Sequence, residues 1–269
     1  MLYRLVAVDL DGTLLDSVSR IPEATARAIR DFRRLGGFFT LATGRSEDST
    51  RAYAEELGLD EPLIAFNGGK VMSLKTGEVF YETFLDSEKG VRAFYALRAL
   101  GKDVVVYRDG VPHVSQMTDV VERYQRRIKL DLSFISDARE TIGTTTKKLL
   151  VIDPAREFGP MADAVRPIFG DSLNCVNSDD YFFEVLPPLT SKAHGLLLVA
   201  ERLGVPVREV VAVGDHLNDV PMIEAAGVGV AVANATQAAL DAADYVTASN
   251  DEDGVGKLLR RIIAGESLP

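Results

Sequence analysis

A run of four apolar residues, Leu5–Val8, leads directly into an acidic segment, Asp9–Thr13, that reads DLDGT. Such an unbroken apolar run is typical of a strand buried on both faces, as in parallel sheets. Open α/β sheets bind ligands at the carboxyl ends of their strands, where these two acids stand. Since side chains two positions apart share one face of a strand, we expect Asp9 and Asp11 to repel each other unless a cation binds there. Taken alone, the segment also fits a solvated turn.

Alternating strand and helix patterns continue along the first third of the chain. Pro22 suits the first turn of a helix that Gly36 and Gly37 end, and Phe38–Leu41 is predicted to be the second strand. A third strand is expected over Leu63–Phe66, followed by a hairpin. This alternation predicts an α/β fold, with a parallel sheet covered by helices on both faces.

The pattern changes near Phe84, where mixed strands and helices replace the regular alternation. The expected elements are helices over Ser87–Leu100, Asp119–Ile128 and Phe158–Phe169 and strands over Val104–Tyr107, Pro112–Ser115, Lys148–Ile152, Leu173–Val176 and Tyr181–Leu186. Together they would make a compact α+β module of about a hundred residues. We therefore expect a discontinuous core domain, residues 1–83 and 187–269, with an inserted domain of residues 84–186.

The composition narrows the class of protein. The chain has 269 residues, of which 46% are hydrophobic, so it can bury a sizeable core. Its net charge of −10 argues against a nucleic-acid or anionic membrane partner but not against a small anionic substrate. The single cysteine, Cys175, cannot form an internal disulfide, and we expect it to be a small buried hydrophobic residue. Without a secretory leader or a transmembrane run in the sequence, we expect a cytoplasmic protein.

Three further segments place polar residues beside apolar runs. They are LATGR at residues 41–45, SK at residues 191–192 and GDHLND at residues 214–219. With DLDGT, and in this order, they resemble the four motifs of the haloacid dehalogenase superfamily. The resemblance is closest to Cof-type phosphatases, which carry a large type IIB cap between the second and third motifs. It extends to FNGG at residues 66–69, ANA at residues 233–235 and NDEDGV at residues 250–255.

The resemblance implies a Rossmann-like core that hydrolyses a phosphate monoester through a covalent aspartyl-phosphate. In the family, the first aspartate of the first motif, here Asp9, attacks phosphorus. The second, here Asp11, protonates the leaving alcohol and then activates water. The implied cofactor is Mg²⁺, with side-chain ligands from Asp9 and Asp215, the backbone carbonyl of Asp11, and Asp219 nearby. From the residues alone, Asp215 and Asp219 also fit acids that the start of a helix stabilises.

The other motif residues are implied to bind the phosphate group. Thr43 would donate its hydroxyl and Lys192 its ammonium, with the backbone amide of Gly44 as a further donor. Asn218 would donate to the phosphate or orient the loop. Arg45 would contact the substrate or pair with an acid. From the residues alone, Thr43 also fits a helix cap, and Lys192 also fits a solvated surface lysine.

The third motif departs from the family pattern. The stretch Pro188–Ser191 reads PLTS where glycine and valine are common, and Ala193 stands where glycine is common. The family therefore implies the lysine but not the shape of the loop around it. We expect His194 and His216, which flank the motifs, to be structural.

The size of the inserted segment predicts the kind of substrate. A capped cleft would obstruct a protein-bound phosphate, so we expect a small phosphorylated metabolite such as a sugar phosphate. Lys147, Lys148, Asp180 and Tyr181 are candidate contacts, chosen because we expect them in loops. Two alternatives stay open: a phosphomutase on the same core, and a phospho-acceptor signalling module, although such modules are shorter and lack the DxDGT order.

Overall fold

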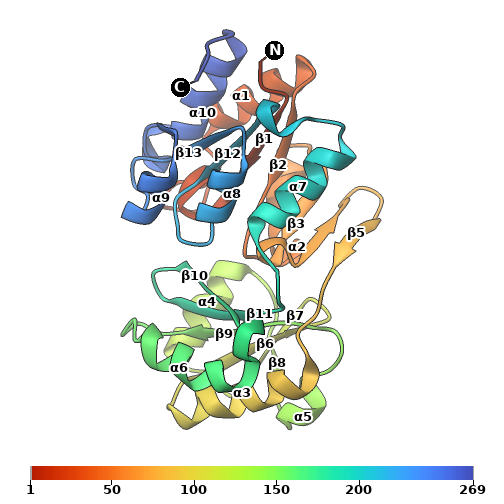
Figure 1. Cartoon of the computed structure of the whole chain (residues 1–269), viewed down its shortest axis with the longest axis vertical. Coiled ribbons are helices and arrows are strands. Elements are labelled where there is room, and N and C mark those ends of the chain that lie inside the picture. Colours follow the sequence, from red (N-terminus) through yellow and green to blue (C-terminus); the bar gives the residue numbers. More distant parts are fainter. Residues whose placement is uncertain (1, 269) are drawn as a thin grey trace. The chain divides into compact units, whose positions relative to one another are not determined.

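The computed structural model describes residues 2–268. The chain forms two compact units (Figure 1). The first unit comprises Met1–Gly44, Thr50–Tyr81 and Ser191–Pro269. The second comprises Arg45–Ser49 and Glu82–Thr190. The first unit is thus discontinuous in sequence, and one long internal segment forms most of the second.

Five parallel strands form the main sheet of the first unit, in the order β14-β13-β12-β1-β2. Their bounds are Leu5–Val8 for β1, Phe38–Leu41 for β2, Val210–Gly214 for β12, Val228–Ala231 for β13 and Tyr245–Val246 for β14. β1 lies between β12 and β2, and all four of its residues are buried, as predicted for a strand covered on both faces. Because these strands are parallel, the loops after β1, β2 and β12 leave the same edge of the sheet.

Helices cover both faces of this sheet, which confirms the predicted α/β architecture (Figure 1). They are α1 (Glu23–Arg34), α2 (Glu47–Glu56), α7 (Lys192–Arg202), α8 (Val220–Ala225), α9 (Gln237–Ala242) and α10 (Gly254–Ile263). On one face, Leu196 of α7 and Met222 of α8 join Leu5 and Ala7 of β1 in one apolar cluster. On the other face, α1 packs against α10. Burial of apolar surface, at roughly 25 cal/mol per Å², stabilises both layers.

A small antiparallel sheet flanks the main one, in the order β3-β4-β5. Its strands are β3 (Leu63–Ala65), β4 (Lys70–Met72) and β5 (Val79–Glu82), which confirms the predicted hairpin. A parallel bridge between Ala42 and Ile64 joins β3 to the end of β2. The predicted strand over Leu63–Phe66 is one residue too long, because Phe66 takes a positive φ of 50° that no strand can accommodate.

The second unit is built on a six-stranded sheet in the order β10-β11-β9-β6-β7-β8. Its strands are β6 (Val104–Arg108), β7 (Val111–Val114), β8 (Ser133–Phe134), β9 (Thr146–Ile152), β10 (Asn174–Asp179) and β11 (Phe182–Leu186), and its helices are α3 (Ser87–Ala99), α4 (Asp119–Ile128), α5 (Ala138–Thr141) and α6 (Phe158–Phe169). One apolar cluster joins the sheet to α3 and α6, and Cys175 packs against it half-buried. No helix formed by residues 2–268 is long and apolar enough to span a membrane.

Two of the expected loop positions in the second unit are wrong. Lys147 and Lys148 lie inside β9 and are buried. The strand begins at Thr146, two residues earlier than predicted, so it includes Lys147 as well as Lys148, which was predicted as its first residue. Lys147 Nζ lies 2.8 Å from Glu82, and Lys148 Nζ lies 2.8 Å from Glu184. Their charges therefore have structural partners within this unit. Asp180 and Tyr181 do lie in the turn between β10 and β11, where Arg156 contacts both.

Candidate active site

The loop after β1 holds the acidic pair in a tight turn. The backbone N–H of Asp9 donates to the carbonyl of Val213 at 2.9 Å, which continues the pairing of β1 with β12. Residues Leu10–Leu14 then form one helical turn, in which Asp11 and Gly12 have non-helical dihedral angles. The strand alternation that we expected to place Asp9 and Asp11 on one face is therefore wrong, since β1 ends at Val8.

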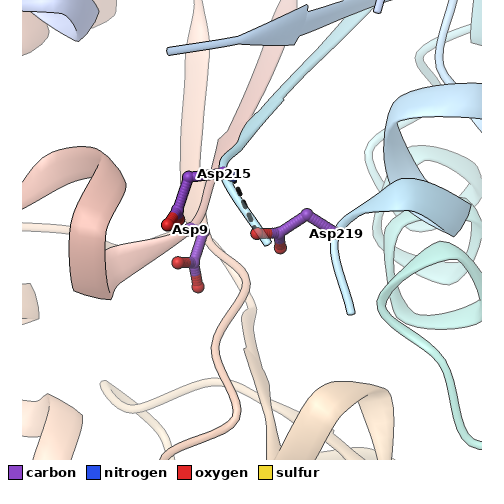
Figure 2. Close-up of side chains that lie close together, drawn as sticks. All are labelled: Asp9, Asp215 and Asp219. Atoms are coloured by element: carbon purple, nitrogen blue, oxygen red, sulfur yellow. Dashed lines mark hydrogen bonds between the residues drawn. The ribbon is translucent and has the colours of Figure 1, made fainter. Parts of the chain in front are cut away.

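Three carboxylates from two loops converge at this edge of the sheet (Figure 2). Asp9 follows β1, whereas Asp215 and Asp219 follow β12, and one carboxylate oxygen of each lies within 4.8 Å of the others. Asp9 is 6% exposed and Asp219 is 0% exposed, so water screens their mutual repulsion only weakly. Oxygen donors gathered in this way fit a hard divalent cation such as Mg²⁺.

Gly12 and Thr13 bring the first loop against Asp215. The Thr13 hydroxyl donates to Asp215 Oδ1 at 2.7 Å. Gly12 has a φ of +79°, and a β-carbon at this position would lie 2.5 Å from Asp215 Oδ2. A residue without a side chain is thus required both by the backbone conformation and by the close approach to the carboxylate.

Lys192 is the cation of the site. It is the first residue of α7, after Ser191, whose hydroxyl accepts a hydrogen bond from the N–H of His194. Its Nζ lies 2.5 Å from Asp9 Oδ1 and 2.6 Å from Asp219 Oδ1, and its side chain is 0% exposed. The alternative of a solvated surface lysine is therefore wrong. The sequence could not settle this point because Lys192 lies 183 positions from Asp9.

The pKa values of these groups reflect burial and close charges. Burial raises the pKa of Asp9 well above its usual range; Lys192 opposes this shift, while the other carboxylates add to it. Burial and the neighbouring Asp219 raise the pKa of Asp215 to about 6, although the hydrogen bond from Thr13 lowers it. Burial lowers the pKa of Lys192, but Asp219 and Asp9 raise it by more, so the lysine stays charged.

Asp219 differs from the other two carboxylates in that protein donors occupy both of its oxygens. Oδ1 accepts from Lys192 Nζ, and Oδ2 accepts from the backbone N–H groups of Asp215 and His216, both at 3.0 Å. The dashed line in Figure 2 marks one of these bonds. Asp219 therefore fixes the loop after β12 and the ammonium of Lys192 at the same time.

The second-motif residues follow β2, beside the loop that follows β3. Thr43 is buried, and its backbone pairs with Ile64 and Asn67. A β-carbon on Gly44 would lie 3.2 Å from the Asn67 side chain, which in turn accepts a hydrogen bond from Asn218 Nδ2 at 2.9 Å. The structure thus gathers Thr43, Gly44 and Asn218 around one asparagine.

Two residues predicted for the site, Asp11 and Arg45, lie outside the carboxylate cluster and the group around Asn67. Two residues that were not predicted, Thr13 and Asn67, belong to them. Asp11 lies in the turn after Asp9, but its carboxylate is not one of the three that converge. Arg45 is buried and groups with the second unit, so its role stays a prediction. Thr13 and Asn67 both lie in segments that carried the resemblance, yet only their contacts 202 and 151 positions away reveal them as site residues.

Comparison with known proteins assigns the chain to a family. A family profile described as haloacid dehalogenase-like hydrolase matches residues 6–259. The Bacillus subtilis protein named "Putative phosphatase YxeH" is 31% identical, over 97% of this chain and 99% of that protein. The chain therefore belongs to the haloacid dehalogenase-like hydrolase family.

A second relative and a solved structure refine this assignment. The Bacillus subtilis 5-amino-6-(5-phospho-D-ribitylamino)uracil phosphatase YcsE is 28% identical, over 96% of this chain and 94% of that protein. A solved structure described as a subclass IIB sugar phosphatase superposes with a TM-score of 0.84 and covers 96% of this chain and 98% of its own. At 23% identity this likeness concerns the fold. The chain is a haloacid dehalogenase-like phosphatase of the Cof type with a subclass IIB fold, as the resemblance implied.

Proposed function

We propose that this phosphatase uses Mg²⁺ to hydrolyse small phosphate monoesters through a phosphoaspartate at Asp9. The observation that carries the proposal is the buried cluster of Asp9, Asp215 and Asp219 with Lys192 between two of them. One ammonium against three ionised carboxylates leaves a net charge of about −2 in a poorly solvated place. A divalent cation offsets that charge, and the all-oxygen donor set fits magnesium.

The residues divide the chemistry between two half-reactions. An oxygen of the Asp9 carboxylate attacks phosphorus, and the bond from phosphorus to the ester oxygen breaks. The carboxylic acid of Asp11 gives its proton to the departing alkoxide. In the second half-reaction, the Asp11 carboxylate takes a proton from water while the water oxygen attacks phosphorus. The bond from phosphorus to the Asp9 oxygen breaks, inorganic phosphate leaves, and Asp9 is again a free carboxylate.

Asp9, Asp215 and the backbone carbonyl of Asp11 would hold the metal. When bound, Mg²⁺ supplies positive charge beside the phosphate oxygens, where phosphoryl transfer needs it. We place Asp219 outside the direct ligands, because Lys192 and two backbone N–H groups already occupy its oxygens. Its role is to orient Lys192, which neutralises charge between Asp9 and the phosphate.

The phosphate oxygens would be bound by donors from three segments. These donors are the hydroxyl of Thr43, the backbone amide of Gly44, the ammonium of Lys192 and the amide group of Asn218. Each of them recognises the group that all phosphate monoesters share, so they do not choose among substrates. We propose that the second unit is the cap, as predicted for residues 84–186, and that it recognises the leaving alcohol.

Asp215→Asn is expected to weaken magnesium binding by at least about tenfold, since it removes one anionic ligand. The amide keeps an oxygen that can still accept from Thr13, so the fold should persist. Magnesium would be titrated by calorimetry and by activity. Asp60→Asn is the matched control, because Asp60 pairs with Lys75 on the surface of the same unit. An unchanged magnesium affinity in Asp215→Asn would place the metal elsewhere.

Substrate choice is tested by a screen of phosphorylated metabolites with magnesium. We expect release of inorganic phosphate from a subset of small sugar or ribityl phosphates, the latter because YcsE is named for such a substrate. Family membership favours hydrolysis over a phospho-acceptor module. Conversion of a sugar phosphate to its isomer would instead support the mutase, and a stable phosphoprotein without turnover would support the acceptor module.

A chimera tests whether the second unit sets that choice. Residues 84–186 would be exchanged for the corresponding segment of YcsE, with both parents measured beside it. We expect the order of kcat/KM among substrates to follow the exchanged segment, while hydrolysis of para-nitrophenyl phosphate, whose leaving group needs little recognition, persists. If the order of substrates stays that of this chain, the cap does not select them.

A further inference from the structure

The turn between β3 and β4 has an unusual backbone. Phe66, Asn67 and Gly68 have φ values of 50°, 55° and 90°, so three consecutive residues lie in the left-handed region. Only glycine enters this region without cost, and asparagine does so more readily than bulky residues. A turn of this kind persists only where its surroundings hold it in place. The contacts of Asn67 and Gly68 therefore show which parts of the structure hold this turn in place.

Asn67 joins the second and fourth motifs. Its backbone N–H donates to the carbonyl of Thr43 at 2.9 Å. Its side-chain Oδ1 accepts from Asn218 Nδ2 at 2.9 Å, in a bond where both residues are buried. The same side chain lies against Gly44, where a β-carbon would approach it to 3.2 Å. Asn67 thus contacts three of the four residues to which we assign phosphate binding.

Gly68 joins the turn to the third motif. A β-carbon on Gly68 would lie 2.0 Å from the backbone carbonyl oxygen of Ser191, the residue before Lys192. One turn further along α7, a β-carbon on Gly195 would lie 2.5 Å from Cγ2 of Ile64 and 3.4 Å from Cα of Gly68. The start of α7 therefore rests directly on the Ile64 side chain of β3 and on the backbone of this turn. That contact fixes the position of Lys192, the first residue of α7.

We propose that the turn Phe66–Gly68 is a positioning element that sets Thr43, Lys192 and Asn218 at fixed separations, with Asn67 as a positioning residue for the amide of Asn218. The inference rests on the proposed function, because it takes those groups as the phosphate site. The left-handed turn allows the backbone to contact Thr43 and Ser191 on either side, while the Asn67 side chain reaches Asn218. A regular strand or helix could not make all three contacts.

The test is a double-mutant cycle on Asn67 and Asn218. Asn67→Gly keeps the positive φ accessible but removes the acceptor. We expect it to lower kcat/KM about tenfold and to weaken competitive inhibition by inorganic phosphate by a similar factor, as loss of one coupled contact does. In the Asn218→Ala background, Asn67→Gly should change either quantity by no more than about twofold. Lys129→Gly is the control, since Lys129 has a φ of 56° at the end of α4 in the other unit.

The contact between α7 and β3 is tested by overpacking and its relief. Gly195→Ala should lower kcat because the added methyl group pushes α7, and with it Lys192, away from Ile64. The pair Gly195→Ala with Ile64→Ala should return to the kcat of Ile64→Ala alone. Recovery of this kind distinguishes displacement of Lys192 from a general loss of stability, which the second substitution would worsen.

Four outcomes are decisive. Wild-type inhibition by phosphate in Asn67→Gly, or equal effects of that change with and without Asn218, would overturn the positioning role of Asn67. An unchanged kcat in Gly195→Ala would overturn the role of the α7 contact. A wild-type protein that neither hydrolyses phosphate monoesters nor binds phosphate would instead refute the proposed function, before any variant is compared.

Discussion

Asp9→Asn is expected to abolish phosphatase activity, with a loss of at least about 10⁴-fold in kcat. An amide oxygen is too weak a nucleophile to attack phosphorus, so no phosphoaspartate forms. The fold should persist, because asparagine has the same size and keeps an oxygen that can accept from Lys192. Burial already raises the pKa of Asp9 well above its usual range, so removal of the charge also removes an electrostatic cost.

The measurement is the hydrolysis rate with saturating magnesium and the best substrate of the screen. Asp31→Asn, an exposed acid of α1, is the matched control and should retain full activity. Circular dichroism of each variant would establish that the fold is kept. Near wild-type turnover by Asp9→Asn would show that another residue is the nucleophile.

Lys192→Met has the second large expected effect, on both activity and stability. The change leaves two buried carboxylates, Asp9 and Asp219, without their shared cation. Breaking a buried ion pair by removal of one partner costs about 3–5 kcal/mol of unfolding free energy. Activity should fall as well, because negative charge on the phosphate would no longer be neutralised beside Asp9.

The stability loss in Lys192→Met should depend on pH in a defined direction. Without the ammonium, the pKa of Asp9, already raised by burial, rises further. A carboxyl group whose pKa is higher in the folded state loses its proton first in the unfolded state, so stability falls as pH rises through the interval between the two values. The deficit relative to the wild type should therefore grow as pH rises from the Asp9 pKa of the wild-type fold to the higher Asp9 pKa of the variant, and urea unfolding without magnesium at the two ends of that range measures it. Lys75→Met, which breaks an exposed pair with Asp60, should show little deficit at either pH.

Much of the fold could be predicted because local patterns carry it. The buried run of β1 and the helical periodicity of α4 and α6 are properties of consecutive residues, and both helices have the predicted bounds. The short elements β8 and α5 were not predicted, since two and four residues give no period to recognise. Lys147 and Lys148 were expected in loops because a charged residue in a buried strand contradicts the usual pattern. Their ion pairs with Glu82 and Glu184 help to stabilise them in the strand.

The sequence predicted most of the residues of the site but not the contacts among them. The motif order indicated Asp9, Asp215 and Lys192, but distances among them depend on strand order, which brings β12 beside β1. The same holds for Asn67, whose partner Asn218 is 151 positions away. The left-handed turn that holds Asn67 has no sequence signal beyond Asn-Gly, which marks many ordinary hairpins.

Chemical trapping of the intermediate tests the central claim most directly. The enzyme would be quenched during turnover with magnesium and substrate and then treated with borohydride, which reduces an aspartyl-phosphate to homoserine. Peptide mass spectrometry locates the reduced residue. We predict homoserine at position 9 in the wild-type chain and none in Asp9→Asn. Reduction at another aspartate, or turnover that leaves Asp9 unmodified while phosphate accumulates, would contradict the account.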